Sequence, residues 1–289
     1  MTGNISIVIP AFNEAGAIKP TLAALREMIK SSGLSAEIIV VDDGSTDGTG
    51  DLVMAEEGVR LIRHRQNRGY GASLKTGIRQ ANNDVIVITD ADGTYPIEMI
   101  PVLAAEIGPF DMVVGARTGR EVQIPLVRRP AKAALTRLAN YLSGIEIPDL
   151  NSGLRAMKRD IVMSYFRLLP SGFSFTTSVT LAMLTNDYNV SFVPIDYFQR
   201  TGSSKIHPIK DTINFFSLVV RMVLLYRPLR VFIPVVLVMM LLSAVKVLYD
   251  INAYDFHLAT STVVLVTLTV QILVLGLIAD LVVSLHKHS

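Results

Sequence analysis

Acidic and polar side chains gather in three short segments, each placed directly after an apolar run. The segments are residues 10–14 (PAFNE), 42–48 (DDGSTDG) and 90–93 (DADG). Two carboxylates spaced as Asp90-X-Asp92 suit a hard divalent cation such as Mg²⁺ or Mn²⁺, because these ions prefer oxygen ligands and can share a bound diphosphate. Turns also favour Asp and Gly, so this spacing alone is equally compatible with a turn of no catalytic function. The chain contains no Cys and five His, which excludes a thiolate site and argues against zinc.

The first 207 residues alternate short β-rich runs with helical patterns, and these elements must position the acidic segments. Strands are expected at residues 5–9, 37–41, 59–63, 85–89 and 112–115. Helices are expected between them, at residues 14–30, 51–57, 70–80 and 96–107. Strands that are apolar on both faces and alternate with helices predict an α/β fold with a mostly parallel sheet, covered on both sides. Such sheets bind ligands beyond the carboxyl ends of their strands, which is where the acidic segments fall.

Two long apolar runs near the C-terminus raise the mean hydropathy of the chain to +0.43. They cover about residues 231–249 and 258–285. About 20 apolar residues in a helix cross a hydrocarbon core of roughly 30 Å, so both runs are predicted to span a membrane. Lys246 and Asp280 lie near the ends of these runs, where a charged group can reach the headgroup region without any catalytic role.

The charges that flank the apolar runs predict their orientation. Residues 250–257 contain no Lys or Arg, whereas cationic residues precede the first run and follow the second: Arg221, Arg227, Arg230 and Lys287. The positive-inside rule therefore places the large domain and the C-terminus in the cytoplasm. The apolar part of residues 208–228 is too short to span. We expect this segment to form an amphipathic helix in the cytoplasmic interface, with its arginines facing anionic headgroups.

Taken together, the motifs resemble those of the family 2 glycosyltransferases, and the resemblance covers the whole chain. The matching segments are residues 7–14 (IVIPAFNE), 40–49 (VVDDGSTDGT), 67–78 (NRGYGASLKTGI), 89–96 (TDADGTYP) and 149–159 (DLNSGLRAMKR). With residues 199–206 (QRTGSSKI) and the terminal apolar runs, the chain is similar to the polyisoprenyl-phosphate glycosyltransferases. This resemblance implies a nucleotide-sugar-binding domain of the GT-A type at residues 1–207, followed by an interface helix at 208–228 and a membrane anchor at 229–289.

The resemblance also implies roles for individual residues on the donor side. Pro10 and Phe12 would flank the nucleotide base, Glu14 would lie near the ribose, and Asp43 would hydrogen-bond the base. Asp90 would contact the ribose or sugar and Asp92 would be the principal ligand of a Mg²⁺ or Mn²⁺ ion, so the metal site is expected at Asp90 and Asp92. Many relatives carry Leu-Gln directly after the Asp-X-Asp motif. Gly93 and Thr94 stand there in this chain, which leaves the second protein ligand of the metal open.

On the acceptor side, the resemblance implies a set of cations that hold phosphates: Arg117, Arg128 or Arg129, Arg200 and Lys205. A second set would border the sugar and the acceptor phosphate: Asp149, Asn151, Ser152 and Arg155. Asp92, Asp149, Arg117 and Arg200 are the expected catalytic residues. Arg128 and Arg129 recur at helical spacing with Lys132 and Arg137, so all four could equally form a solvated or membrane-surface face. Tyr70 and Tyr95 follow turn signals and are expected to be packing residues beside the cleft.

The expected reaction is an inverting transfer of one hexose from a UDP- or GDP-linked sugar to undecaprenyl or dolichyl phosphate at the cytoplasmic membrane face. Donor and acceptor are both anionic, and bringing them together requires cations. A phosphate whose second pKa is about 6 is already ionised. Asp149 is therefore expected to position groups rather than remove a proton.

Two other classes of function are compatible with these motifs. A membrane glycosyltransferase that extends a glycan or polysaccharide would share the first four motifs, and a non-catalytic membrane scaffold could retain the fold. The net charge of +2 and the lack of a recognition motif argue against nucleic-acid binding. Apolar interface helices make a homo-oligomer possible.

Overall fold

A computed structural model of the chain describes residues 4–119, 140–141, 144, 146–172, 174–198, 220, 223–224, 227–253 and 257–287. Four predicted site residues lie outside these ranges: Arg128, Arg129, Arg200 and Lys205. Most of the predicted interface helix at 208–228 also lies outside the described residues. The roles assigned to these parts of the chain therefore stay predictions.

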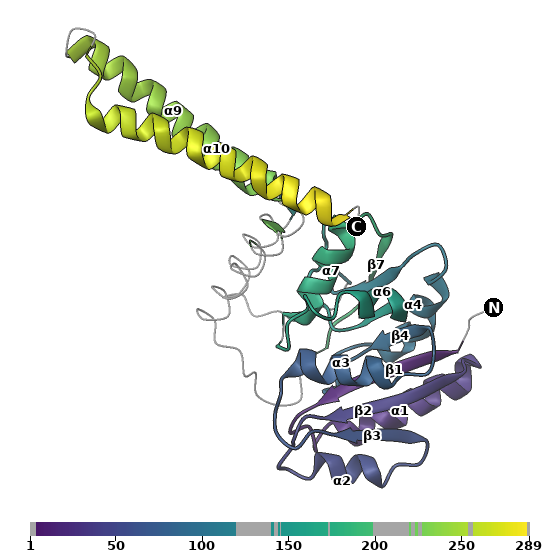
Figure 1. Cartoon of the computed structure of the whole chain (residues 1–289). Helices are drawn as coiled ribbons and strands as arrows, with labels where there is room; N and C mark the ends of the chain where they lie inside the picture. Colours follow the sequence, from purple (N-terminus) through teal and green to yellow (C-terminus); the bar gives the residue numbers. More distant parts are fainter. Residues whose placement is uncertain are drawn as a thin grey trace.

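One mixed sheet of seven strands forms the centre of the N-terminal domain (Figure 1). The strands are β1 (Ile5–Ala11), β2 (Ala36–Asp42), β3 (Val59–Arg63), β4 (Val85–Ile88), β5 (Met112–Ala116), β6 (Arg155–Lys158) and β7 (Val190–Pro194). Their order is β3-β2-β1-β4-β6-β5-β7, and only β6 runs antiparallel to its neighbours. Strand β1 is buried along its whole length because it pairs on both edges and is covered on both faces. The predicted mostly parallel sheet is confirmed.

Helices cover both faces of this sheet. They are α1 (Ile18–Ser32), α2 (Thr49–Met54), α3 (Tyr70–Gln80), the 3₁₀ turn η1 (Ile97–Met99), α4 (Ile100–Glu106), α6 (Arg159–Ser164) and α7 (Phe175–Thr185). Residues of α1, α2 and α4 pack in one apolar cluster with β1 and β2, and residues of α3, α6 and α7 pack in a second cluster on the opposite face. The periodic pattern of α3 predicts its bounds, 70–80, whereas α7 is buried on all sides and shows no amphipathic period.

Strand β6 reverses the chain in the middle of the sheet, and this reversal assembles the site. Arg155, its first residue, pairs with Ile88 of β4 and with Val114 of β5. Because β6 is antiparallel, the residues that precede it lie beyond the carboxyl ends of β4 and β5. Residues 149–154 therefore share an edge of the sheet with Asp90, two residues after β4, and Arg117, the residue after β5.

The C-terminal part is a hairpin of two helices, α9 (Leu229–Ala253) and α10 (Thr260–Lys287), which projects away from the domain (Figure 1). Both are long and apolar enough to cross a membrane, as the sequence predicted. Asp250 fastens the end of α9 to the start of α10. Its carboxylate accepts hydrogen bonds from Lys246 Nζ at 2.7 Å, Ala259 N at 2.8 Å and Thr262 Oγ1 at 2.5 Å. Lys246 thus forms an ion pair with Asp250 within α9. The position of Lys246 near the end of a span did not predict this partner.

Candidate active site

Asp43, the predicted base-binding residue, is a buried hub at the end of β2. Its Oδ1 accepts the backbone N–H of Arg68 at 2.9 Å and lies 2.6 Å from His64 Nδ1, and its Oδ2 accepts the N–H of Gly69 at 2.8 Å. The other ring nitrogen of His64 lies 3.0 Å from Thr76 Oγ1 on α3. A carboxylate has about four acceptor positions. Three of these positions on Asp43 already hold the loop before α3, so a nucleotide base could bond only to the remaining one.

Hydrogen bonds that involve side chains connect the segment around Asn13 to the segment around Ser45. Asn13 has a φ of 57° and its backbone N–H donates to Ser45 Oγ, while its own Oδ1 accepts the N–H of Thr46. The N–H of Glu14 donates to Thr49 Oγ1. These contacts turn the chain directly after β1, so α1 begins later than the pattern predicted. They also place Pro10, Phe12 and Glu14 at the carboxyl edge of the sheet, beside the Asp43 hub.

The two carboxylates of the Asp-X-Asp motif have different surroundings. Asp90 Oδ1 accepts a hydrogen bond from the hydroxyl of Tyr70 at 2.9 Å. Asp92 is 7% exposed, and its Oδ1 accepts from Thr94 N at 3.2 Å and Thr94 Oγ1 at 2.7 Å. Burial, and after it the charge of Asp90, raise the pKa of Tyr70 well above that of an ordinary phenol, so its hydroxyl remains a hydrogen-bond donor.

These carboxylates provide oxygen ligands of the kind that Mg²⁺ and Mn²⁺ prefer. Within the described residues, no group of three or more Asp, Glu or His side chains is arranged to hold a metal. Asp90 and Asp92 would hold such an ion through their carboxylate oxygens, and a bound diphosphate would share it. Thr94 fixes the orientation of the Asp92 carboxylate by holding one of its oxygens. The donor set fits a cation that binds together with a nucleotide.

Arg117 and Asp149 form a buried bidentate ion pair. Arg117 Nε lies 2.6 Å from Asp149 Oδ2 and Arg117 Nη2 lies 2.9 Å from Oδ1. Two backbone donors complete the carboxylate, Arg117 N at 3.1 Å and Asn151 N at 3.2 Å. Burial by itself lowers the pKa of Arg117, but Tyr95 and the Asp149 carboxylate outweigh it and raise that pKa above its usual range. Arg117 is therefore a permanent cation whose guanidinium plane is fixed.

An aromatic bridge joins this ion pair to the Asp-X-Asp motif. The guanidinium carbon of Arg117 lies 5.0 Å from the ring centroid of Tyr197. Tyr197 meets Tyr95 edge-on, with ring centroids 5.3 Å apart. The hydroxyl oxygen of Tyr95 accepts the N–H of Gly153 at 2.6 Å, and Gly153 lies against the Asp90 carboxylate. Residues expected on the donor side and the described residues expected on the acceptor side are thus connected by direct contacts.

Ser152 and Arg155 lie beneath this site rather than on its surface. Arg155 is 0% exposed, donates from Nε and Nη2 to the carbonyl of Ser152, and donates from Nη1 to Thr176 O at 3.0 Å and Thr180 Oγ1 at 2.8 Å. Burial lowers the pKa of Arg155 to about 10. Ser152 Oγ is buried and has no hydrogen-bond partner among the described residues. The observed contacts of Arg155 tie β6 to α7, and a contact of either residue with an acceptor phosphate stays a prediction.

Three residues of the site were not predicted to hold its charged groups: Tyr70, Tyr197 and His64. Tyr70 and Tyr95 were expected to be packing residues, and both make hydrogen bonds at the site. His64 follows β3 and Tyr197 follows β7, and neither lies in a segment with a chemical motif. His64 comes directly after β3, which is a local signal that could have identified it, whereas Tyr197 and Tyr70 lie three and seven residues beyond the preceding strand.

Arg227 and Arg230, which are expected to face anionic headgroups, both contact the domain, and their orientation toward a membrane stays a prediction. Arg227 Nη2 lies 3.4 Å from Asp187 Oδ1, and Arg230 Nη1 donates to the carbonyl of Tyr141 at 3.2 Å. These contacts fasten the start of α9 to the domain.

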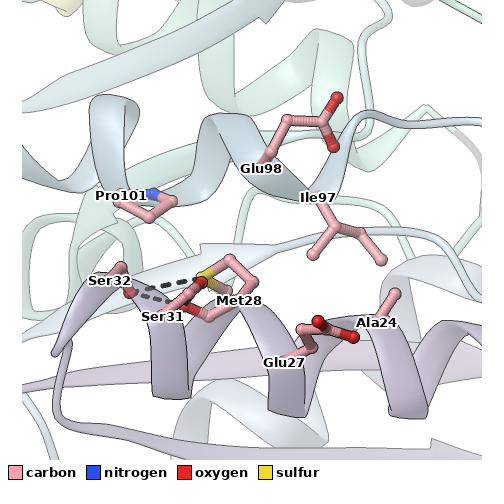
Figure 2. A pocket seen from close by; sticks show the side chains of 8 residues that line it. All are labelled: Ala24, Glu27, Met28, Ser31, Ser32, Ile97, Glu98 and Pro101. Carbon is pink, nitrogen blue, oxygen red and sulfur yellow. Dashed lines mark hydrogen bonds between the residues drawn. The ribbon is translucent and has the colours of Figure 1, made fainter.

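A surface groove between α1 and the η1–α4 segment contains no predicted site residue (Figure 2). It is lined by Ala24, Glu27, Met28, Ser31, Ser32, Ile97, Glu98 and Pro101.

Known proteins resemble the chain in both of its parts. Residues 6–166 match the family described as "Glycosyl transferase family 2", and residues 227–285 match the "GtrB C-terminal hairpin". The dolichyl-phosphate hexose transferase of Haloferax volcanii is 30% identical over 207 residues, which are 71% of this chain and 87% of that protein. The undecaprenyl-phosphate mannosyltransferase of Micrococcus luteus is 29% identical over 212 residues, 69% of this chain and 86% of that one.

Solved structures share the fold. Glucosyl-3-phosphoglycerate synthase from Mycobacterium tuberculosis, crystallised with Mn²⁺, UDP and glucosyl-3-phosphoglycerate, is 22% identical with a TM-score of 0.59. The match covers 76% of this chain and 78% of that one. A crystal of the same enzyme with Mg²⁺ and UDP gives a TM-score of 0.56 at 22% identity, with coverage of 76% and 78%. From the match over residues 6–166 and the relatives that span most of its length, the chain belongs to glycosyl transferase family 2.

Proposed function

We propose that the chain transfers one hexose, with inversion, from a UDP- or GDP-linked sugar to the phosphate of a polyisoprenol at the cytoplasmic face of a membrane. The observation that carries this proposal is the connected site at the edge of the sheet. An Asp-X-Asp pair suited to a metal-bound diphosphate lies one aromatic bridge away from a buried, permanently charged arginine. One site therefore offers charge compensation for two phosphate-bearing substrates.

The relatives and the helical hairpin support a lipid acceptor. The names of two relatives describe hexose transfer to dolichyl phosphate and mannose transfer to undecaprenyl phosphate. The hairpin of α9 and α10 would hold the domain at the membrane, where the phosphate of such a lipid lies. The contacts of Arg227 and Arg230 with the domain would keep the site at a constant height above the bilayer.

At the donor end, the residues of this chain bind and orient the nucleotide-sugar. Asp43 shapes the loop beside the base, and Asp90 and Asp92 present oxygens toward the diphosphate. A bound Mg²⁺ or Mn²⁺ ion would offset the charge that develops on the departing diphosphate. The residues at positions 93 and 94 contribute a turn and a hydrogen bond to Asp92 rather than a further carboxamide ligand.

At the acceptor end, the phosphate oxygen attacks the anomeric carbon from the face opposite the diphosphate. The new bond joins that oxygen to the anomeric carbon, and the bond from the anomeric carbon to the diphosphate oxygen breaks with its electron pair on the nucleoside diphosphate. Arg117 Nη1 makes no hydrogen bond with a described side chain or carbonyl, so its N–H groups are oriented for a phosphate by the pairing of Nε and Nη2 with Asp149. An ionised phosphate needs no general base.

A screen of donors and acceptors tests this proposal. The full chain, in detergent or in vesicles, is incubated with radiolabelled UDP- and GDP-hexoses and with undecaprenyl or dolichyl phosphate, with and without Mn²⁺ or Mg²⁺. Metal-dependent label in the lipid fraction is the expected result. Transfer to a glycan with no label in either lipid would support the polysaccharide-extending class of enzyme instead.

A further inference from the structure

Tyr70 makes a contact with the Asp-X-Asp motif that the reaction described above does not use. It is the first residue of α3, so it enters the site from the loop after β3, whereas Asp90 follows β4. Its hydroxyl donates to Asp90 Oδ1 at 2.9 Å. A hydrogen bond to a charged acceptor is among the stronger ones in proteins, and it fixes the direction in which the second oxygen of the carboxylate points.

The backbone that carries Tyr70 is held on both sides and cannot shift easily. A Cβ on Gly69 would lie 2.6 Å from the carbonyl oxygen of Ser171. A Cβ on Gly71 would approach the backbone of the same segment equally closely. The N–H of Ala72 donates to that same Ser171 oxygen at 3.0 Å. Side chains larger than hydrogen are therefore excluded at positions 69 and 71. The backbone that carries the Tyr70 ring is therefore held in place.

Asp43 holds the same loop from the other direction. Its carboxylate accepts the N–H groups of Arg68 and Gly69, the two residues directly before Tyr70. The residue expected to bind the base and the residue expected to bind the metal thus share one short stretch of backbone. Displacement at Asp43 would be transmitted through Gly69 to the phenol and from there to Asp90.

Gly153 confines the opposite side of the Asp90 carboxylate. A Cβ at this position would lie 2.9 Å from Asp90 Oδ2 and 3.1 Å from Oδ1. Asp90 is therefore fitted between the Tyr70 hydroxyl and the peptide backbone of the segment before β6. Orientation by groups outside the motif keeps a charged ligand in its working geometry before substrate arrives.

We propose that Tyr70 is a positioning residue that holds the Asp90 carboxylate in the orientation needed to bind a metal-complexed nucleoside diphosphate. It acts through Asp90 and does not touch the substrate. This inference rests on the proposed function, since it requires a nucleoside diphosphate and a divalent cation as ligands of the site.

The test compares Tyr70→Phe with the full wild-type chain in detergent. Phenylalanine removes only the hydroxyl and retains the ring. Free Mn²⁺ is titrated by electron paramagnetic resonance in the presence of UDP and, separately, GDP, and thermal unfolding is measured on the same samples. Tyr70→Phe is expected to weaken Mn²⁺-nucleotide binding by about tenfold or more, the scale of losing a hydrogen bond to a charged group. Its KM for donor should rise more than its kcat falls.

Two further variants make the result specific. Tyr188→Phe removes a hydroxyl from a ring that packs edge-on against Tyr165, away from the site, and should bind Mn²⁺-nucleotide as the wild type does. Gly153→Ala leaves Tyr70 intact but crowds Asp90 from the other side, and it should weaken binding as Tyr70→Phe does. Wild-type affinity in Tyr70→Phe would overturn the inference, whatever the result with Gly153→Ala. If the wild-type chain itself bound neither nucleotide with Mn²⁺, the proposed function would fail first.

Discussion

The buried pair of Arg117 and Asp149 permits a sharp prediction for Asp149→Asn. Both oxygens of Asp149 accept two donors each in the structure. An Asn side chain has one oxygen and one NH₂ group, so in either orientation its NH₂ faces two N–H donors. The substitution keeps the shape of the residue, removes the charge that compensates Arg117, and adds a donor–donor repulsion.

The structure also sets the magnitude. The Asp149 side chain is 0% exposed and that of Arg117 is 14% exposed, so solvent screens this pair little. Removing one partner of a buried pair costs about 3–5 kcal/mol. A domain of roughly 200 residues loses about 2–4 °C of melting temperature per kcal/mol, so Asp149→Asn should lower Tm by about 6–20 °C. The double variant Arg117→Gln/Asp149→Asn should recover part of this loss, because no charge is then left unpaired.

Thermal unfolding and pH–rate profiles separate positioning from base catalysis. We expect Asp149→Asn to reduce transfer through a displaced Arg117 while the shape of its pH–rate profile stays that of the wild type. Asp92→Ala, which removes a predicted metal ligand, should lose more activity with less effect on Tm. The reasoning is refuted if Asp149→Asn loses as much activity as Asp92→Ala, loses the acidic limb of its pH–rate profile, and unfolds at the wild-type temperature.

Four further predictions concern the fold, pH, metal and hairpin. Gly77→Ala should destabilise the chain by about 1–2 kcal/mol in chemical denaturation, because its methyl group would collide with β1. This loss is expected although Ala favours helices more than Gly does. Gly16→Ala adds a methyl group in open space and should not have this effect. Burial raises the pKa of Asp111, but the hydrogen bond from Lys158 and that from a backbone N–H outweigh it, so the folded pKa is lowered. The stability that this carboxylate contributes is fully present above the unfolded pKa of about 3.9 and is lost as pH falls through the lower folded pKa. Asp111→Asn should therefore be less stable than the wild type at neutral pH, and the two melting temperatures should converge only below the folded pKa. Chelation by EDTA should stop transfer, Mn²⁺ or Mg²⁺ should restore it, and Asp92→Asn should need more metal for half-maximal rate. Asp250→Ala should lower the melting temperature in detergent, since it removes the acceptor that joins the end of α9 to the start of α10.

The predicted strands 5–9, 37–41, 59–63, 85–89 and 112–115 agree with β1 to β5 within two residues. Their apolar runs and bounding turns are local signals. The start of α1 was predicted at Glu14 and lies at Ile18, because backbone N–H groups before it donate to side chains of another segment. Strands β6 and β7 were not predicted. Residues of β6 (RAMK) carry charge at both ends and are short, so no pattern distinguishes them from a loop.

The site was predictable at the level of residue types. The placement of Asp90, Asp92, Arg117 and Asp149 at one edge follows from strand ends and from the resemblance to known enzymes. The contacts that hold these groups join distant parts of the chain, as Tyr70 joins Asp90 and Arg117 joins Asp149. Such pairs have no characteristic spacing, so only the three-dimensional arrangement reveals them.

The reversal of β6 has a consequence for how this enzyme can change. The chain leaves the sheet after β5, returns to the same edge before β6, and is clasped at its base by the ion pair of Arg117 and Asp149. Loop-closure entropy grows only slowly with length, so we expect changes in the number of residues between Arg117 and Asp149 to alter the cost of closing this ion pair only slightly. Changes made there leave the register of β4, β6 and β5 untouched. We therefore expect the number of residues on the predicted acceptor side to vary while the sheet that carries Asp90 and Asp92 stays the same.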